Sequence, residues 1–334
     1  MIADPRRGPQ DTPRVAVVGC GYWGANLVRN FAALGALGAV HDEERGAAEL
    51  AAASTGAEAK SWDAILTDTT IDAVAISTPP ATHAELAVAA LEAGKDVFVE
   101  KPLALHVGDA EQVTKTAAAA DRVLMVGHLL RYHPAFIELE SLVRRGALGE
   151  LRYIYSNRLN FGRFRRVENI LWSFAPHDIS MILTLVGAEP DVVTAISASY
   201  LQQEIADVTT THLSFQGGQA AHVFVSWLHP FKEQKLVVIG AQAMAVFDDG
   251  EPWTSKLRVY EHEVAWREGV PEARKTDGRD IDIPQREPLL QECAHFIDCV
   301  VTRTPPLTDG HEGTRVLRVL EAAERSMRSA EQRE

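Results

Sequence analysis

The feature that most constrains this chain is a set of three glycines between a short apolar run and an amphipathic stretch. In "RVAVVGCGYWGANLVRNFAAL", residues 14–34, Gly19, Gly21 and Gly24 follow the apolar run and precede residues with helical periodicity. Glycines at this spacing allow a tight turn and a close approach of backbone to a pyrophosphate, and the helix N-terminus offers N–H groups to an anion. The stretch predicts a dinucleotide-binding turn, and an ordinary glycine turn is the plainer alternative.

The residues after this turn alternate short apolar runs, such as "IDAVAIS" and "VFVE", with stretches of helical periodicity. This alternation is typical of a parallel sheet covered by helices. In one helical stretch, Thr82 and Glu85 have the spacing of a capping box and Gly94 is placed to end the helix. We therefore predict an α/β chain whose residues 14–130 form a Rossmann domain with a doubly wound parallel sheet, which binds its ligand at the carboxyl ends of the strands.

The pattern changes in the second half of the chain, where longer alternating runs joined by glycine and polar turns indicate antiparallel strands. One helical stretch, "PHDISMILTLVG", interrupts them, with Pro176 suited to its first turn and Gly187 to its end. We expect residues 131–290 to form an α+β domain with an open, mostly antiparallel sheet for substrate binding and oligomerisation. Residues 291–334 are expected to form helices that pack back on the first domain, and residues 1–13 a mobile N-terminal extension.

One expected strand, "QAAHVFVSWL", is apolar on both faces. Ala221, Val223, Val225 and Trp227 lie on one face, and Phe224 lies with Leu228 on the other. Because helices would cover only one face of this sheet, we expect the other to pack against a second copy of the chain, in a homodimer or homotetramer. The alternative is a cover formed by residues 251–285 of the same chain.

Composition excludes several classes of partner. The net charge of −13 argues against nucleic acid or an anionic membrane as the main partner, and no apolar stretch reaches the roughly 20 residues of a membrane span. Cys20, Cys293 and Cys299 are spaced neither for a disulfide framework nor for a metal site, which favours a cytoplasmic location. Since no His, Cys or Asp cluster has the spacing of metal ligands, we expect no metal.

An acidic residue follows the second apolar run. Asp42 lies at the distance from the glycines where a carboxylate accepts hydrogen bonds from the adenosine ribose hydroxyls. Because a carboxylate there repels a 2′-phosphate, NAD is favoured over NADP, although Arg45 nearby would suit NADP. A solvated loop acid is the plainer interpretation of Asp42.

A lysine ends another buried run. In "VFVEKPLAL", Lys101 reaches the carboxyl edge of the expected sheet, where its ammonium group can hydrogen-bond a substrate hydroxyl or carbonyl oxygen. Partial burial beside a cationic nicotinamide should lower the pKa of this lysine. Without the upstream glycines, a surface charge would be the preferred interpretation. The other residues expected at this edge of the cofactor site are Ser77, Thr78, Pro79 and Glu100.

Five motifs together carry a family resemblance. "GCGYWG", "STPPATH", "EKPLAL", "VGHLLRYHPA" and "WSFAPHDISM" occur in the order and spacing of the Gfo/Idh/MocA oxidoreductases, which this chain resembles from about residue 14 to its end. The resemblance implies a Rossmann domain, a second domain with an open sheet used in dimers or tetramers, and hydride transfer between a nicotinamide and a sugar or polyol carbon. Tyr22, Trp23 and His83, which lie in the quoted motifs, complete the expected cofactor-binding residues.

The resemblance also assigns catalytic residues. The family's catalytic lysine falls on Lys101 and its catalytic histidine on His177. Many members carry an aspartate four residues before that histidine, and Ser173 replaces it here, which makes an inositol or simple glucose substrate less expected. We expect His177 in the first turn of its helix, where the helix dipole disfavours the imidazolium form and suits a neutral base. A helix-capping histidine is the alternative.

Basic residues precede the helix expected to carry the histidine. Arg158, Arg163, Arg165 and Arg166 lie in "SNRLNFGRFRRVENILW" of an otherwise acidic chain. Arginine pairs with phosphate through two parallel hydrogen bonds, so these residues suggest a phosphorylated substrate, with a solvated basic loop as the alternative. The expected substrate-binding residues are Lys101, Arg131, Tyr132, Arg158, Asn160, Arg163, Arg166, Trp172, Ser173 and His177.

Longer stretches narrow the resemblance within the family. "NILWSFAPHDISMIL" and "SWLHPFKEQKLVVIG" resemble the nucleotide-sugar branch, the UDP-N-acetylglucosamine and UDP-N-acetylglucosaminuronate 3-dehydrogenases, which oxidise the C3 hydroxyl before transamination to a 3-amino sugar. The resulting hypothesis is NAD-dependent oxidation of the C3 hydroxyl of a UDP-hexose. The alternatives are a nucleoside or nucleotide 3′-dehydrogenase, a nucleotide-sugar 3-ketoreductase, and a dinucleotide-binding sensor without enzymatic activity.

Overall fold

The computed structural model describes residues 12–162 and 164–331 of the chain. Residues 1–11, on which most of the expected N-terminal extension falls, lie outside the described residues. The described chain divides into two compact units. Unit 1 comprises residues 12–132 and 286–317, and unit 2 comprises residues 133–285 and 318–331.

Unit 1 contains a parallel sheet of six strands in the order β3-β2-β1-β4-β5-β6. From β1 the chain adds β2 and β3 on one side and then β4, β5 and β6 on the other, so the strand order reverses between β1 and β4. This order confirms the predicted doubly wound sheet. The strands are β1 (Val15–Val18), β2 (Leu37–His41), β3 (Glu58–Ala59), β4 (Ala73–Ile76), β5 (Asp96–Glu100) and β6 (Leu124–Gly127).

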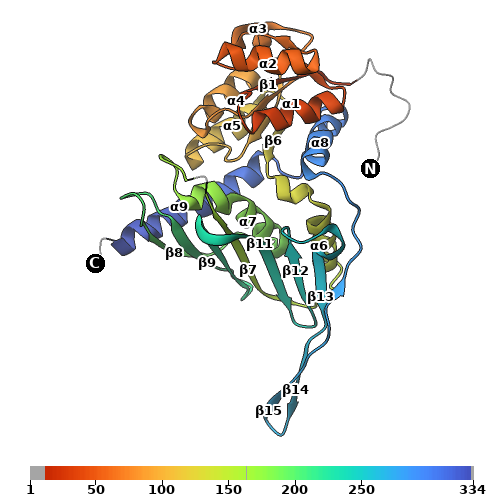
Figure 1. Cartoon of the computed structure of the whole chain (residues 1–334), viewed down its shortest axis with the longest axis vertical. Helices are drawn as coiled ribbons and strands as arrows, with labels where there is room; N and C mark the ends of the chain where they lie inside the picture. The colour runs from red at the N-terminus through yellow and green to blue at the C-terminus, as the bar shows by residue number, and fades with distance from the viewer. Residues whose placement is uncertain (1–11, 163, 332–334) are drawn as a thin grey trace. The chain divides into compact units, whose positions relative to one another are not determined.

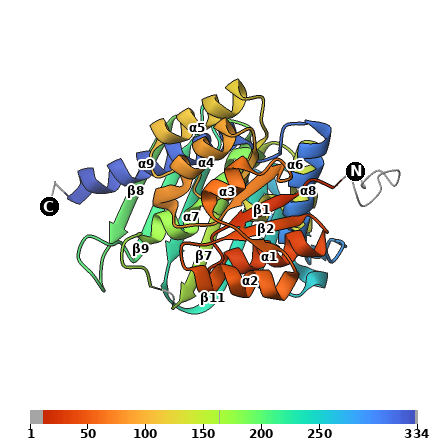
Figure 2. The same cartoon turned by 90° about the horizontal axis from the view of Figure 1, so that it is seen from above.

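Helices cover both faces of this sheet, with α1 (Gly24–Ala33) and α2 (Arg45–Thr55) on one side and α4 (His83–Glu92) and α5 (Val107–Ala119) on the other (Figure 2). Phe296 of α8 (Pro288–Thr302) makes edge-to-face contacts with Phe31 and Phe98, at centroid separations of 6.3 and 5.8 Å. Helix α8, from the C-terminal part of the chain, therefore packs into the same hydrophobic core as α1. Helix α3 (Trp62–Thr67) lies between β3 and β4 in the sequence.

The start of α4 differs from the sequence prediction. The predicted capping box is wrong, because Thr82 makes no side-chain capping bond. Its hydroxyl instead donates to the Pro79 carbonyl at 2.9 Å and lies 2.7 Å from the Thr78 hydroxyl, within a short turn, Pro80–Thr82. The Thr82 hydroxyl therefore stabilises the loop after β4 and does not cap the helix. Gly94, at φ +77°, follows the end of α4 as predicted.

Unit 2 contains a mixed, mostly antiparallel sheet of eight strands in the order β16-β13-β12-β11-β7-β10-β9-β8, which confirms the predicted class of the second domain. Only the neighbours β7 and β10 run parallel. The strands are β7 (Leu151–Phe161), β8 (Val192–Ala198), β9 (Val208–Ser214), β10 (Ala220–Ser226), β11 (Leu228–Gly240), β12 (Met244–Asp248), β13 (Leu257–Tyr260) and β16 (Arg279–Asp280).

The two faces of this sheet differ in their cover. On the inner face Ile154, Val223 and Val225 are fully buried, where α7 (Ile170–Val186) packs on β7, β9 and β10. On the outer face the ring of Tyr155 stacks on His222, with centroids 5.4 Å apart. The alternation predicted for β10 is therefore confirmed. Helix α6 (Pro134–Arg144) packs against α7 and β12.

Residues 251–285 were the alternative cover for the outer face. They add strands to the edge of the sheet instead. They supply β13, which pairs with β12, and β16, which pairs with β13. Between these strands a hairpin of β14 (Glu263–Arg267) and β15 (Val270–Arg274) projects beyond the sheet (Figure 1). Its Trp266 is 70% exposed.

Helix α7 begins six residues earlier than the sequence predicted. The expectation that Pro176 lies in the first turn is wrong, because the Asn169 side chain accepts a hydrogen bond from the Trp172 amide and starts the helix at Ile170. Pro176 lies inside the helix, and the left-handed Gly187 ends it as predicted. His177 consequently lies in the third turn of α7 rather than the first.

The last helix, α9 (Gly310–Glu331), is divided between the units. The sequence assigned all of residues 291–334 to the first domain, whereas residues 318–331 belong to unit 2. There the Ser326 hydroxyl accepts a hydrogen bond from the Ala195 amide of β8 at 2.9 Å, and Arg318 lies 3.4 Å from Glu189. These bonds explain the different boundary.

Candidate functional site

The glycine turn of unit 1 lies where the strand order reverses. Gly19 adopts φ +92°, and a Cβ there would lie 2.8 Å from the Thr78 nitrogen. A Cβ on Gly24 would lie 1.8 Å from the Gly19 oxygen, so α1 can begin this close to the turn only with glycine. By contrast, a Cβ on Gly21 would meet no atom within 4 Å. The turn thus leaves open space beside the start of α1, as pyrophosphate binding requires.

Asp42 is tied to the glycine turn. Its Oδ2 accepts a hydrogen bond from the Cys20 amide at 2.6 Å, and its Oδ1 accepts one from the Glu44 amide at 2.9 Å. A carboxylate can accept further hydrogen bonds at both oxygens, so Asp42 is held in place and still able to accept from ribose hydroxyls. Arg45 is largely exposed and pairs with Glu49 at 2.7 Å. Burial and Asp42 raise the pKa of the neighbouring Cys20 thiol to about 11, which keeps it protonated.

The loop after β4 is bonded to the segments on either side. The Ser77 hydroxyl donates to the Gly19 carbonyl at 2.7 Å. The buried ring of His83 lies between two carbonyl oxygens, with Nε2 2.8 Å from that of Thr78 and Nδ1 2.7 Å from that of Pro102. Since burial lowers the pKa of His83, the neutral ring donates to one of them at a time. Three loops are therefore held together at the carboxyl edge of the sheet.

Glu100 and Lys101 end β5 at the same edge. The Trp23 indole N–H donates to Glu100 Oε1, so Glu100 binds the residue directly before α1. Burial raises the pKa of Glu100 to about 7, while the bond from Trp23 and the charge of Lys101 act in the opposite direction. Lys101 is half-buried, and its peptide bond to Pro102 is cis. Tyr22, another residue expected to bind the cofactor, is 72% exposed.

Two expected substrate residues of unit 1, Arg131 and Tyr132, interact with other side chains of the same unit. Arg131, only 7% exposed, lies 3.2 Å from Glu312 of α9. The Tyr132 hydroxyl is buried 2.8 Å from the Thr308 hydroxyl. His128 is also buried, and burial together with Arg131 and Lys101 lowers its pKa to about 3, which keeps the ring neutral.

A buried acid in the same unit was not anticipated. Glu292 of α8 is fully buried, and within the described part of the chain neither of its oxygens has a hydrogen-bond partner. Burial, and then the charge of Glu100, raise its pKa well above the usual range. The sequence does carry a signal, because Glu292 is the acid in a stripe of apolar residues, with Leu289, Cys293 and Phe296, on α8.

Unit 2 presents His177 on α7. Because His177 lies in the third turn, the helix-dipole argument for a neutral base fails, since that effect fades beyond the first turn. The neighbouring Asp178 was not anticipated as a site residue. Its carboxylate accepts two hydrogen bonds from Arg158, at 2.6 and 3.1 Å, and one from the Ser156 hydroxyl at 2.5 Å. Arg158 therefore bonds β7 to α7 rather than pointing to solvent.

The other expected substrate residues of unit 2 lie around the loop before α7. Trp172 and Ser173 are in the first turns of α7 and are at most 9% exposed. Asn160 is half-buried near the end of β7, and Arg166 is exposed in the loop. Arg163 lies outside the described residues.

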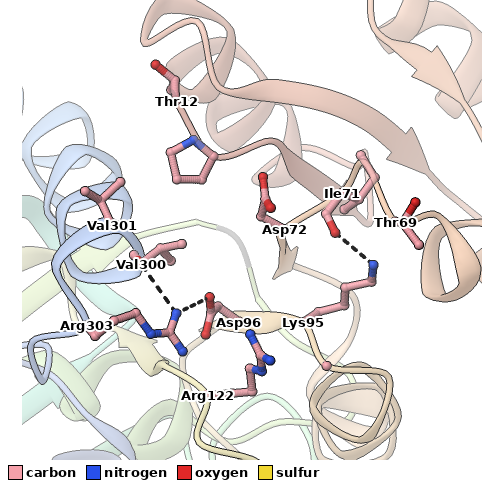
Figure 3. Close-up of a pocket in the computed structure, with 12 residues that line it drawn as sticks. Thr12, Thr69, Ile71, Asp72, Lys95, Asp96, Arg122, Val300, Val301 and Arg303 are labelled. Carbon is pink, nitrogen blue, oxygen red and sulfur yellow. Dashed lines mark hydrogen bonds and ion pairs between the residues drawn. The ribbon is translucent and has the colours of Figure 1, made fainter. Parts of the chain in front are cut away.

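A polar cavity of about 550 Å³ lies at the other edge of the unit 1 sheet, where β4 and β5 begin (Figure 3). Its charged groups bind one another and the backbone. Lys95 donates to the carbonyls of Asp68 and Ile71 at 2.6 and 2.8 Å, and Asp96 accepts from Arg303 at 2.7 Å. Because ligands of doubly wound sheets bind at the carboxyl ends, this cavity is not the candidate site.

Two further expectations can be compared with the described residues. Among residues 12–162 and 164–331, no group of three or more His, Cys, Asp or Glu side chains is arranged to hold a metal ion. In the same part of the chain, no helix has both the length and the apolar character needed to cross a membrane.

Comparisons with known proteins match both parts of the chain. A model described as "Oxidoreductase family, NAD-binding Rossmann fold" matches residues 13–128, and one described as "GFO/IDH/MocA C-terminal domain" matches residues 136–246. The chain is 29% identical to a UDP-N-acetylglucosamine 3-dehydrogenase of Acidithiobacillus ferrooxidans, over 91% of this chain and 94% of that protein. A solved structure of that enzyme has a TM-score of 0.84 at 28% identity, covering 95% of this chain and 97% of that one. A scyllo-inositol 2-dehydrogenase (NAD(+)) of Bacillus subtilis is 26% identical over 95% of this chain and 94% of that protein.

Proposed function

The chain belongs to the Gfo/Idh/MocA family of oxidoreductases, and from that premise we propose that it oxidises the C3 hydroxyl of a UDP-hexose of the UDP-N-acetylglucosamine type. The observation that carries the proposal is the set of bonded loops at the carboxyl edge of the unit 1 sheet, which fits a dinucleotide and ends in Lys101. The choice of sugar rests on the similarity, over most of both chains, to a UDP-N-acetylglucosamine 3-dehydrogenase. Inositol dehydrogenases are also relatives, but an inositol substrate is less expected because Ser173 replaces the aspartate that many family members carry.

The proposed mechanism gives each catalytic residue one task. The Lys101 ammonium group donates a hydrogen bond to the C3 oxygen and stabilises the negative charge that develops there. His177 accepts the hydroxyl proton as a general base. NAD, when bound, supplies the acceptor for the hydride that leaves C3. The substrate thus loses one proton and one hydride and becomes a 3-keto sugar.

NAD is proposed as the preferred cofactor over NADP. The Gly19–Gly24 turn and the start of α1 would hold the pyrophosphate, and Asp42 would accept hydrogen bonds from the adenosine ribose. Asp42 also repels a 2′-phosphate. Arg45, the residue that could attract one, already pairs with Glu49.

We also propose that the outer face of the unit 2 sheet pairs with a second copy of the chain. Strand register places Tyr155 beside His222 and Val237, and Tyr153 beside Ile239, on this face. Val237 is already buried, but Tyr153, Tyr155, His222 and Ile239 keep part of their surface exposed, and burial of that surface in a symmetric interface would be stabilising. The cytoplasm remains the proposed location, which agrees with three free cysteines.

The first test is NADH formation with UDP-N-acetylglucosamine or its uronate, in the presence of glutamate and a 3-aminotransferase that removes the keto product. We expect Lys101→Met and His177→Ala each to lower kcat by about 10²-fold or more, because each removes an interaction of the transition state. Lys115→Met, at an exposed position of α5, should be neutral. Near-normal turnover of Lys101→Met or His177→Ala would contradict the mechanism, whereas absence of turnover in a parent protein that binds NAD would redirect the search to other nucleotide-linked sugars.

A further inference from the structure

Two phenylalanine rings are exposed next to the arginine-rich loop of unit 2. Phe161 ends β7 and is 65% exposed, and Phe164 follows it and is 41% exposed. Their rings meet edge to face at a centroid separation of 5.6 Å. Phe164 in turn meets the buried Trp227 edge to face at 6.2 Å. We call the two exposed rings, Phe161 and Phe164, the aromatic step.

Trp227, against which the aromatic step packs, is held in place by hydrogen bonds. The Trp227 indole N–H donates to Asp207 Oδ1, and Asp207 Oδ2 accepts hydrogen bonds from the amides of Tyr200 and Leu201, at 2.6 and 2.8 Å. Asp207 and Trp227 are both 1% exposed. Trp227 therefore provides a fixed contact for Phe164, and Asp207 joins the aromatic step to the loop of residues 199–206. Two phenylalanines held in place at the surface lose the benefit of apolar burial, which points to a ligand that covers them.

Cationic groups lie in the same loop. Arg165 and Arg166 directly follow Phe164, and both are exposed. The Arg165 carbonyl accepts a hydrogen bond from the Gln202 side chain at 3.4 Å, and the Ile170 amide at the start of α7 donates to the Ala206 carbonyl at 3.0 Å. The aromatic step, the two arginines and the first turn of α7 therefore belong to one bonded surface of unit 2.

We infer that the aromatic step stacks the base of a nucleoside diphosphate whose phosphates pair with Arg165 and Arg166. Aromatic faces stack any nucleobase, and arginine pairs with phosphate through two hydrogen bonds, so a chain that alternates them suits a ligand with both groups. This inference rests on the proposed function, because it identifies where the nucleotide of the sugar substrate would bind. It adds two residues that neither the motifs nor the comparisons single out.

The test measures binding of UDP, UMP and inorganic pyrophosphate by calorimetry to the full chain saturated with NAD. Phe161→Ala and Phe164→Ala should weaken UDP and UMP binding about 5- to 150-fold, the range for loss of one stacking ring, and leave pyrophosphate binding unchanged. Phe164→Tyr should restore the affinity, since its ring can stack. Arg166→Gln should weaken UDP and pyrophosphate alike. Trp266→Ala, which removes an exposed ring from the β14–β15 hairpin, is the matched control and should bind UDP normally.

The outcomes separate this inference from the proposed function. If UDP-hexose is oxidised and both alanine variants keep the parental affinity and KM, the inference is wrong and the function stands. If the variants change only the oligomeric state, the step is a protein contact and the inference is wrong. If UDP binds through the phenylalanines but no UDP-hexose is oxidised, the inference stands and the function falls. A parent protein that binds no UDP overturns both.

Discussion

At the scale of single residues, two buried carboxyl groups distinguish unit 1. Glu100 has the Trp23 indole and the charge of Lys101 to stabilise its ionised form, whereas no described residue hydrogen-bonds to Glu292. A buried carboxylate without a partner is far less stable than the neutral acid, and the charge of Glu100 adds repulsion. Glu292 therefore keeps its proton to a higher pH in the folded chain than in the unfolded chain.

This state predicts how stability depends on pH in Glu292→Gln. In the unfolded chain Glu292 ionises near its ordinary pKa, and in the folded chain it keeps its proton, so its contribution to stability is present at low pH and is lost as pH rises. Gln cannot titrate. As pH rises above the ordinary range of a glutamate pKa, urea unfolding should show the variant gaining stability relative to the parent, by at most about 1.4 kcal/mol per pH unit.

The matched control is Glu92→Gln, at an exposed position of α4, whose difference from the parent should not change with pH. A constant difference for Glu292→Gln as well would mean that Glu292 is ionised in the folded chain. The idea of a buried neutral acid would then be wrong.

At the scale of elements, the pair Arg158–Asp178 joins helix α7 to the sheet of unit 2. Both side chains are buried, and the bond is bidentate. Arg158 and Ser156 are two residues apart on β7 and therefore share a face of the sheet. The sequence could not show that a carboxylate from α7 covers this face, because the partner comes from another element, and it therefore assigned Arg158 to the substrate. The early start of α7 has a local cause, since the Asn169 side chain caps the helix.

We expect Arg158→Met to lower the free energy of unfolding by about 3–5 kcal/mol, because it leaves the Asp178 carboxylate buried without its counter-ion. Urea unfolding measures this loss. Adding Asp178→Asn should recover part of it, since the stranded charge is removed.

Arg258→Met is the matched control for this pair. Arg258 also makes a bidentate bond, to Asp280, but both side chains are about 40% exposed, so solvent screens the pair and the loss should be much smaller than for Arg158→Met. An Arg158→Met variant with parental stability and a raised KM for the UDP-hexose would instead support the substrate role.

At the scale of the whole molecule, the predicted classes of both sheets are correct because hydrophobic periodicity is a local property of the sequence. The carboxyl-edge residues of unit 1 were predictable for the same reason, since each follows a recognisable strand. The boundary within α9 was not, because it depends on which sheet Ser326 and Arg318 meet. The inner and outer faces of the unit 2 sheet were also read correctly from β10.

A substitution on the outer face of the unit 2 sheet tests the proposed assembly. Tyr155→Glu places a charge between His222 and Val237, in the middle of the proposed interface between copies. Because a buried unpaired charge is costly, analytical ultracentrifugation should show the mass of a single chain for the variant and a multiple of it for the parent. Leu50→Glu, at a position of α2 that is 74% exposed, should keep the parental mass. A parent that is itself monomeric would refute the proposed assembly.

The contact between Glu100 and the backbone of β6 constrains how this edge of unit 1 can diverge among related chains. A Cβ on Gly127 would lie 2.9 Å from Glu100 Oε2, and the other carboxylate oxygen is bonded to Trp23. A side chain at position 127 would therefore displace Glu100, and a displaced Glu100 would release the indole at the start of α1. A side chain at position 127 is therefore expected to require a change at Glu100 as well, and with it a new partner for Trp23, although the three positions are far apart in the sequence.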